Sequence, residues 1–141
     1  FKLEAHDAIE ENAGLLSEAG ARAIIHSDSS IGIQRLNQET AKAYYAAIDQ
    51  GVQVDENDAL QWMTLNPAWA LGIDQETGSL EVDKMADLVL WSHHPFSVYS
   101  QADLVWVDGI LEHNRANPGP PWSDFELGYT PVINGVSEEG Q

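Results

Sequence analysis

In the first half of the chain, apolar residues recur every three or four positions, which is the spacing of one face of an α-helix. This period predicts a helix over residues 7–19, a second helix that ends at Gly51 and a third that begins at Asp55, a typical N-cap residue. Pro67 is expected to end the third helix, because a proline pushes the residue before it out of the helical conformation. A short helical turn over residues 68–71 follows. The apolar stripe of the second helix consists of Leu36, Thr40, Ala43 and Ala47.

Between the first two helices, residues 22–28 form a β-prone run in which apolar and polar residues do not alternate. Ala23, Ile24 and Ile25 are consecutive, a pattern typical of a strand that is buried on both faces in a parallel sheet. Such a strand needs neighbouring strands to satisfy its backbone hydrogen bonds, and no obvious partner strand is visible in this chain. We therefore expect residues 1 to about 51 to be the end of a larger α/β unit.

After Gly78 the helical period gives way to short extended runs, at residues 86–91, 104–107 and 110–113. The last two runs flank Asp108 and Gly109, and Asp-Gly between apolar runs is a strong hairpin signal. From residue 117 onward the chain is rich in proline and glycine, which favours an extended tail.

The net charge of the chain excludes some classes of binding partner. The 141 residues include 23 Asp and Glu against 6 Lys and Arg, a formal net charge of -17, so nucleic acids and anionic membranes would be repelled. No apolar run reaches the roughly 18 residues of a membrane span, and the chain is expected to be soluble, in the cytoplasm or the periplasm. The absence of cysteine excludes disulfides and thiolate metal sites. A start at Phe1 instead of Met suggests a processed product or a piece of a longer protein.

His26-Ser27-Asp28 is the main candidate for chemistry. Residues two apart on a strand point to the same side, and Asp28 falls where the predicted strand ends. In parallel α/β folds these strand ends line the active site, so Asp28 is a candidate metal ligand or base. In the alternative interpretation, Asp28 caps the following loop and His26 packs in the interior. The residues alone leave both interpretations open.

Other polar clusters are weaker candidates. His93 and His94 are adjacent, and adjacent residues on an extended backbone face opposite ways and chelate a metal poorly. His6 and His113 are isolated, and the acidic run 55–58 is better explained as a helix start than as a calcium loop. The tryptophans are expected in a core or an interface: Trp62, Trp69, Trp91, Trp106 and Trp122. The sequence contains no Walker-type phosphate loop and no Gly-x-Ser-x-Gly elbow.

Four segments carry a resemblance to a known family. Residues 19–28 end in His-Ser-Asp, residues 59–72 contain Ala-Leu, Thr-Leu-Asn-Pro-Ala and Leu-Gly, residues 78–91 read GSLEVDKMADLVLW, and residues 105–109 read VWVDG. In this order they resemble the C-terminal third of the metal-dependent amidohydrolases, particularly the branch around imidazolonepropionase. That family's last barrel strand ends in a metal-binding Asp. Asp83 departs from the family pattern, which has Gly at this turn.

The resemblance implies an α/β fold class, namely the C-terminal fragment of a (β/α)₈ amidohydrolase barrel, with its last strand and helices, plus the C-terminal strands of an accessory β-sandwich. Residues 1–75 would be the end of the catalytic barrel, and residues 76–116 the sandwich strands. Residues 117–141 would be the extended tail.

It also implies a metal-dependent hydrolase of amide or other C–N bonds that acts through a metal-bound hydroxide. The site would hold one or two divalent ions, with zinc the expected metal. Asp28 would bind one of these ions and would act as the general base. His26 would lie behind the metal ligand or pack inside the barrel. The remaining ligands would lie outside this chain, and the fragment alone would be inactive.

The expected partners are the remainder of the parent barrel, a second polypeptide or a second copy of the chain, together with a small amide-type substrate; a bacterial source is expected. Two alternatives stay open. One is a non-catalytic acidic binding or interaction module derived from an amidohydrolase. The other is an amidohydrolase of a different substrate class, such as a dipeptidase or a deacetylase.

Overall fold

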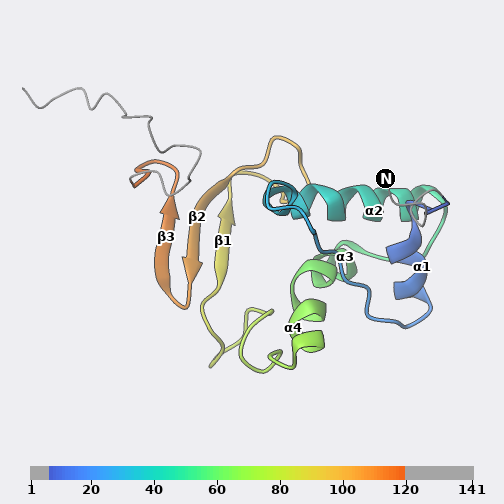
Figure 1. Cartoon of the computed structure of the whole chain (residues 1–141), viewed down its shortest axis with the longest axis horizontal. Coiled ribbons are helices and arrows are strands. Elements are labelled where there is room, and N and C mark those ends of the chain that lie inside the picture. The colour runs from blue at the N-terminus through green and yellow to red at the C-terminus, as the bar shows by residue number, and fades with distance from the viewer. Residues whose placement is uncertain (1–6, 120–141) are drawn as a thin grey trace, which may run out of the picture.

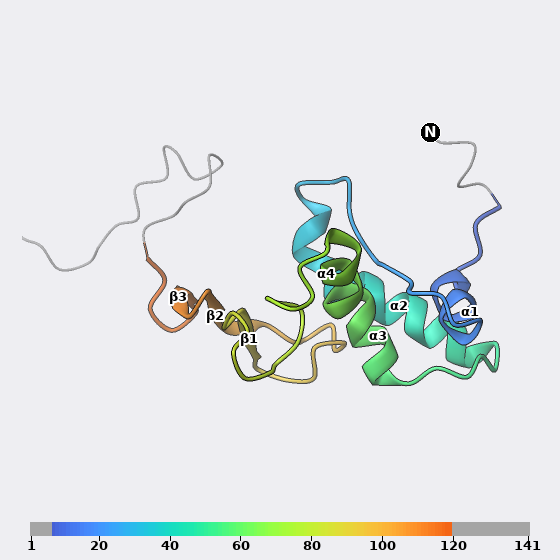
Figure 2. The same ribbon diagram turned by 90° about the horizontal axis from the view of Figure 1, so that it is seen from below.

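A computed structural model of the chain describes residues 7–119, in which helices gather on one side and strands form a sheet beside them (Figure 1; Figure 2). The elements are α1 (Asn12–Glu18), the 3₁₀ helix η2 (Gly32–Arg35), α2 (Leu36–Asp49), α3 (Glu56–Met63), α4 (Leu65–Leu71), β1 (Leu88–Trp91), β2 (Ala102–Val107) and β3 (Ile110–Asn114). None of the helices within residues 7–119 has the length and apolar character that a membrane crossing requires. His6, Trp122 and most of the predicted tail lie outside the described residues.

The second and third predicted helices are confirmed. α2 buries one stripe of side chains that includes Thr40, Tyr44 and Ala47, and Gly51 follows it in the left-handed conformation, with φ of 79°. α3 starts with a capping box. The Asp55 carboxylate accepts the amide of Asp58 at 2.9 Å, and the Asp58 carboxylate accepts the amide of Asp55 at 2.9 Å.

Two predicted helix boundaries are wrong. α1 begins at Asn12 and not at residue 7, and no side chain caps its first turn. α3 ends at Met63, and Pro67 lies in the first turn of α4 instead of ending α3. A proline is tolerated there because the first amides of a helix have no partner within the helix, so the missing N–H costs nothing.

The predicted strand over residues 22–28 is also wrong, because the structure assigns no strand there. The backbone of this segment bonds to helices instead. The Ile25 amide donates to the carbonyl of Trp62 at 3.0 Å, and the Asn66 side-chain amide donates to the carbonyl of Ala23 at 2.9 Å. A strand exists only where a neighbour completes its ladder, and no strand of the described residues lies beside this segment.

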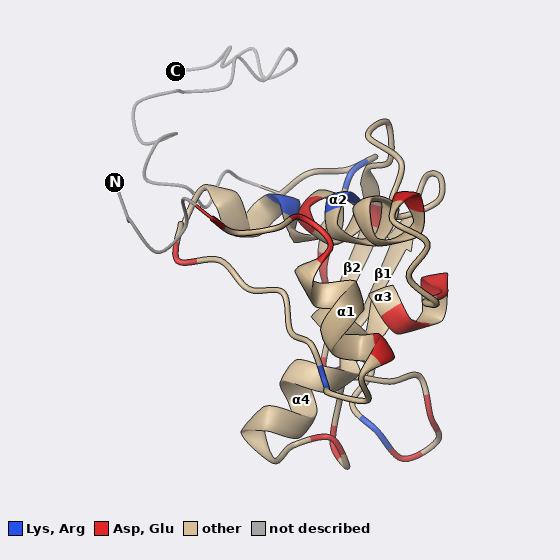
Figure 3. Cartoon of the chain, turned by 90° about the vertical axis from the view of Figure 1, so that its right-hand side faces the viewer, with Lys and Arg blue, Asp and Glu red and all other residues tan. Residues whose placement is uncertain are grey.

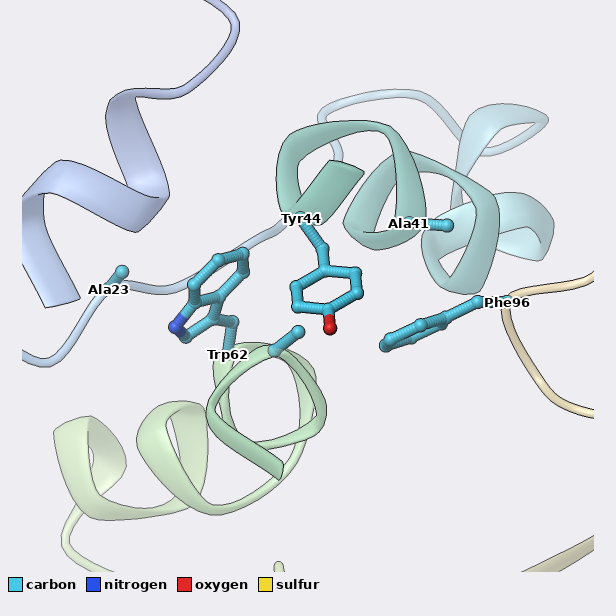
Figure 4. Packing of buried hydrophobic residues seen from close by; sticks show 6 residues of the cluster. Ala23, Ala41, Tyr44, Trp62 and Phe96 are labelled. Carbon is cyan, nitrogen blue, oxygen red and sulfur yellow. The ribbon is translucent and has the colours of Figure 1, made fainter. Parts of the chain in front are cut away.

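The core lies where the segment of residues 22–28 meets α2 and α3 (Figure 4). The Trp62 side chain is fully buried, and its indole N–H donates to the Ser17 hydroxyl at 3.3 Å, so the polar end of the ring is satisfied. Its buried neighbours in the cluster are Ala23, Ala41, Tyr44, Ala59 and Phe96. The expectation of a core tryptophan is therefore confirmed for Trp62.

The predicted hairpin forms. β2 pairs antiparallel with β1 and with β3, so the sheet order is β1-β2-β3. Asp108 and Gly109 join β2 to β3 with φ values of 49° and 77°. Two consecutive residues at positive φ are typical of the type I′ hairpin turn, which matches the twist of the strands and explains the Asp-Gly pair.

The connection between β1 and β2 attaches the sheet to the helices. Phe96 in this connection is 4% exposed and packs on Tyr44, with ring centroids 5.8 Å apart (Figure 4). The preceding carbonyl, that of Pro95, accepts a hydrogen bond from the Asn37 side chain at 2.7 Å. Phe96 and these polar contacts thus link the sheet to the helices.

Candidate functional site

The candidate residues lie on the loop that precedes η2, at an open depression of about 610 Å³. The depression is lined by His26, Ser27, Asp28, Ser29, Ile31, Gly32, Arg35 and Glu39. Sequence reasoning identified the first three residues but missed Arg35 and Glu39. One sequence feature could have identified these two residues. They lie in the first helical turns after a loop that carries a candidate carboxylate.

Side chains alternate along the segment that leads to this loop, although no strand forms. Ala23 is buried and Ile25 half-buried against the helices, whereas His26 and Asp28 face away. The side chains of His26 and Asp28 are 76% and 73% exposed, and His26 Nδ1 lies 3.8 Å from Asp28 Oδ1. The structure therefore brings the two candidate residues side by side on an accessible surface.

Hydrogen bonds within the loop hold the backbone that carries Asp28. The Ser27 hydroxyl accepts the amide of Ser29 at 3.0 Å, and the Ser29 hydroxyl accepts the amide of Gly32 at 3.0 Å. A Cβ at position 32 would come within 3.0 Å of the Ser27 hydroxyl oxygen, so glycine allows the loop to close this tightly. The backbone on both sides of Asp28 is thereby fixed.

The donors of this loop do not by themselves make up a zinc site. A catalytic zinc usually has three protein ligands. Within residues 7–119, no group of three His, Cys, Asp or Glu side chains is placed to hold a metal ion. Asp28, with His26 beside it, can contribute to such a site only if further ligands come from elsewhere.

His93 and His94 contact neighbouring residues of the fold and lie away from the depression. His94 Nε2 lies 3.3 Å from Glu56 Oε2, and its Nδ1 accepts the amide of Phe96 at 3.2 Å, so His94 links the β1–β2 connection to α3. His93 Nδ1 lies 3.0 Å from the hydroxyl of Ser92. Neither ring lines the depression, and within residues 7–119 neither belongs to a group of three His, Cys, Asp or Glu side chains placed to hold a metal ion.

The groups whose pKa is clearly shifted also lie outside the lining of the depression. Burial raises the pKa of the Tyr44 phenol, with a smaller contribution from the nearby Glu56 carboxylate. Hydrogen bonds from Ser79 and then Lys84 lower the pKa of Glu81. The Thr77 hydroxyl and then the Asp108 amide lower the pKa of Asp87.

Comparison with known proteins defines the class. Residues 5–117 match the amidohydrolase family, so the match spans most of the chain, and the chain belongs to that family. A similar solved structure is that of an amidohydrolase from Thermotoga maritima MSB8, with 32% sequence identity and a TM-score of 0.70. The similarity covers 81% of this chain but 28% of the Thermotoga chain. The chain thus spans less than a third of the length of this related structure.

Proposed function

We propose that the chain is the C-terminal part of a metal-dependent hydrolase of amide-type C–N bonds and that Asp28 is its catalytic carboxylate. The observation that supports this most is the position of Asp28. It ends the segment that resembles the family's metal-binding motif, on a loop closed by the hydroxyls of Ser27 and Ser29, and its carboxylate is accessible. An accessible carboxylate on a loop whose backbone is held by hydrogen bonds suits the role of a general base.

In the proposed reaction Asp28 accepts the proton of the attacking water and returns it to the leaving nitrogen. A divalent metal, with zinc the best match to the family, would polarise the substrate carbonyl and favour deprotonation of the water. His26, beside the Asp28 carboxylate, would orient it rather than react itself.

The remaining metal ligands and the rest of the substrate pocket would come from polypeptide beyond this chain. The similarity to 28% of the Thermotoga chain supports this, because most of that fold has no counterpart here. In this proposal residues 1–75 complete a (β/α)₈ barrel, and residues 76–116 complete a β-sandwich. The missing barrel strands would also give residues 22–28 the neighbours that they lack.

A chimera tests the proposal. Residues 7–119 replace the matching segment of the Thermotoga amidohydrolase, and the product is assayed with zinc against N-acyl amino acids, their neutral amides and dipeptides. Asp28→Asn should lower kcat by about 10² to 10⁴, the usual cost of losing a general base. His26→Asn should cost about 10- to 100-fold, as expected for a residue that acts through a metal ligand.

Two controls sharpen the result. The His113→Asn variant changes a histidine on β3, outside the depression, and should leave turnover unchanged. Zinc content and the melting temperature of each variant separate loss of metal and loss of fold from loss of the base. A folded chimera that binds zinc but hydrolyses none of these substrates favours the binding-module alternative. Near-normal turnover by Asp28→Asn would show that another group is the base.

A further inference from the structure

The basic residues of the chain are few, and nearly all those described are occupied by partners within the chain. Six Lys and Arg residues stand against 23 acidic ones, and Lys2 lies outside the described residues. Four of the remaining five have a partner in residues 7–119. These pairs are Arg22 with the Trp69 ring, Lys42 with Glu39, Lys84 with Glu81, and Arg115 with Asp103.

Arg35 is the exception among the described residues, and it lines the same depression as Asp28. Glu39 is four residues away, the spacing at which helical residues form ion pairs. Arg35, however, is the last residue of the 3₁₀ helix η2 and has φ of -120° and ψ of 21°, so it lies outside the α-helical geometry that would direct the two side chains together. The Glu39 carboxylate lies instead 2.5 Å from Lys42 Nζ.

An exposed cation in this depression is unusual because the chain as a whole is strongly acidic. The chain carries a net charge of -17, and acidic segments far outnumber basic ones on its ribbon (Figure 3). An anionic ligand is therefore repelled at long range and needs a local cation to bind. The guanidinium group suits this task, because its fork of N–H groups matches the two oxygens of a carboxylate and it stays charged at any physiological pH.

We propose that Arg35 binds a carboxylate on the substrate, so that the substrate class is an amide that carries a free carboxylate, such as an N-acyl amino acid. This inference rests on the proposed function of Asp28. With the carboxylate on Arg35, the amide lies over the Asp28 side of the depression. The oxygen of water bonds to the acyl carbon, the C–N bond breaks, and the proton taken up by Asp28 passes to the nitrogen. The products are a carboxylic acid and an amino acid.

Binding to the full chain tests this without turnover. The ¹⁵N-labelled protein is titrated with N-acetylglycine and with N-acetylglycinamide, which has a similar shape but no charge. We expect the Arg35 Nε–Hε signal and the amides of residues 29–32 to shift with the carboxylate and not with the amide. Arg35→Gln should weaken binding of N-acetylglycine about tenfold or more, because glutamine lacks the charge and the paired N–H groups that bind the carboxylate.

Two variants serve as controls. Arg115→Gln removes the same charge at the residue that follows β3 and should leave the affinity unchanged. Glu39→Gln removes a carboxylate from the depression and should strengthen binding of N-acetylglycine. Equal binding of both ligands, unchanged affinity in Arg35→Gln, or no shift with either ligand would overturn the role of Arg35.

The chimera separates this inference from the proposed function. If it hydrolyses neutral amides as efficiently as N-acyl amino acids, the hydrolase proposal stands and the carboxylate preference is wrong. If it hydrolyses neither while the chain still binds N-acetylglycine through Arg35, the preference for a carboxylate stands and the hydrolase proposal fails.

Discussion

The helical part and the sheet differ in what they bury. The helical part encloses a cluster around Trp62, which is fully buried, whereas no residue of β1, β2 or β3 is buried. Val89 and Leu90 are 45% and 51% exposed, and neighbouring residues on a strand point to opposite faces. Both faces of the sheet are therefore open. Within the described residues, the helical part has a core of its own, but the sheet has apolar faces without cover.

The partner that we propose for the sheet is the remainder of the parent hydrolase. A three-stranded sheet that exposes aliphatic residues on both faces gains stability when another layer covers those residues. The Thermotoga structure contains much more chain than the part matched here, which is enough for such a layer. The difference between the two regions can be tested by matched substitutions in each.

The largest effect is expected from Trp62→Ala. The substitution leaves a cavity in the only large hydrophobic cluster of the described residues and removes the partner of the Ser17 hydroxyl. Replacing a buried tryptophan by alanine usually lowers the free energy of unfolding by about 3–5 kcal/mol. This loss is a large share of the stability of a domain, which totals about 5–15 kcal/mol. Urea denaturation followed by circular dichroism at 222 nm, the usual helix signal, measures the loss.

Trp106→Ala is the matched control. Trp106 lies on β2 and is half-buried, so its removal should cost well under half as much in the isolated chain. In the chimera, where the proposed covering layer is present, the cost of Trp106→Ala should rise. Equal costs for the two tryptophans in the isolated chain would show that the sheet already has a core.

A somewhat smaller effect is expected from Phe96→Ala, about 3 kcal/mol for a buried phenylalanine. Because Phe96 joins the β1–β2 connection to Tyr44, its loss should uncouple the two regions. Amide hydrogen exchange should then become faster in the sheet than in α2 and α3. Phe96→Leu keeps an apolar side chain and should retain most of the protection. If protection falls equally in both regions, they unfold as one unit.

Features determined by nearby residues were predictable from the sequence. The stop at Gly51, the N-cap at Asp55 and the Asp108-Gly109 hairpin all formed, because each depends on the conformational preference of a few adjacent residues. Pro67 was misjudged, because the same residue ends one helix or begins another according to where the preceding turn stops.

Features determined by distant partners were not predictable. Residues 22–28 have the composition of a strand, but a strand also needs a neighbour, and Trp62 and Asn66 take its place in the described structure. Arg35 was missed for the same reason. Its significance depends on which cations are already paired, and pairs such as Arg115 with Asp103 are visible only after folding. The site role of Asp28 stays a prediction, which rests on the family motif.

The smallest effect concerns the contact between the loop after α4 and the hairpin turn. Asp87 accepts the Thr77 hydroxyl at 2.6 Å and the Asp108 amide at 2.8 Å, and these bonds lower its pKa in the folded state. A lowered folded-state pKa stabilises the fold above the unfolded value of about 3.9, and this contribution is lost as the pH falls through the folded-state pKa.

Asp87→Asn should therefore lower the melting temperature slightly at pH 7, by less than either core substitution, because the carboxylate is exposed to water and its charge is screened. The difference from the unmodified chain should shrink below about pH 4 and vanish once the native carboxylate is protonated. Asp83→Asn removes a charge from the same loop without removing these hydrogen bonds, and it should leave the pH dependence unchanged. A destabilisation by Asp87→Asn that persists in strong acid would mean that the shape of the side chain, and not its charge, holds the loop against the hairpin.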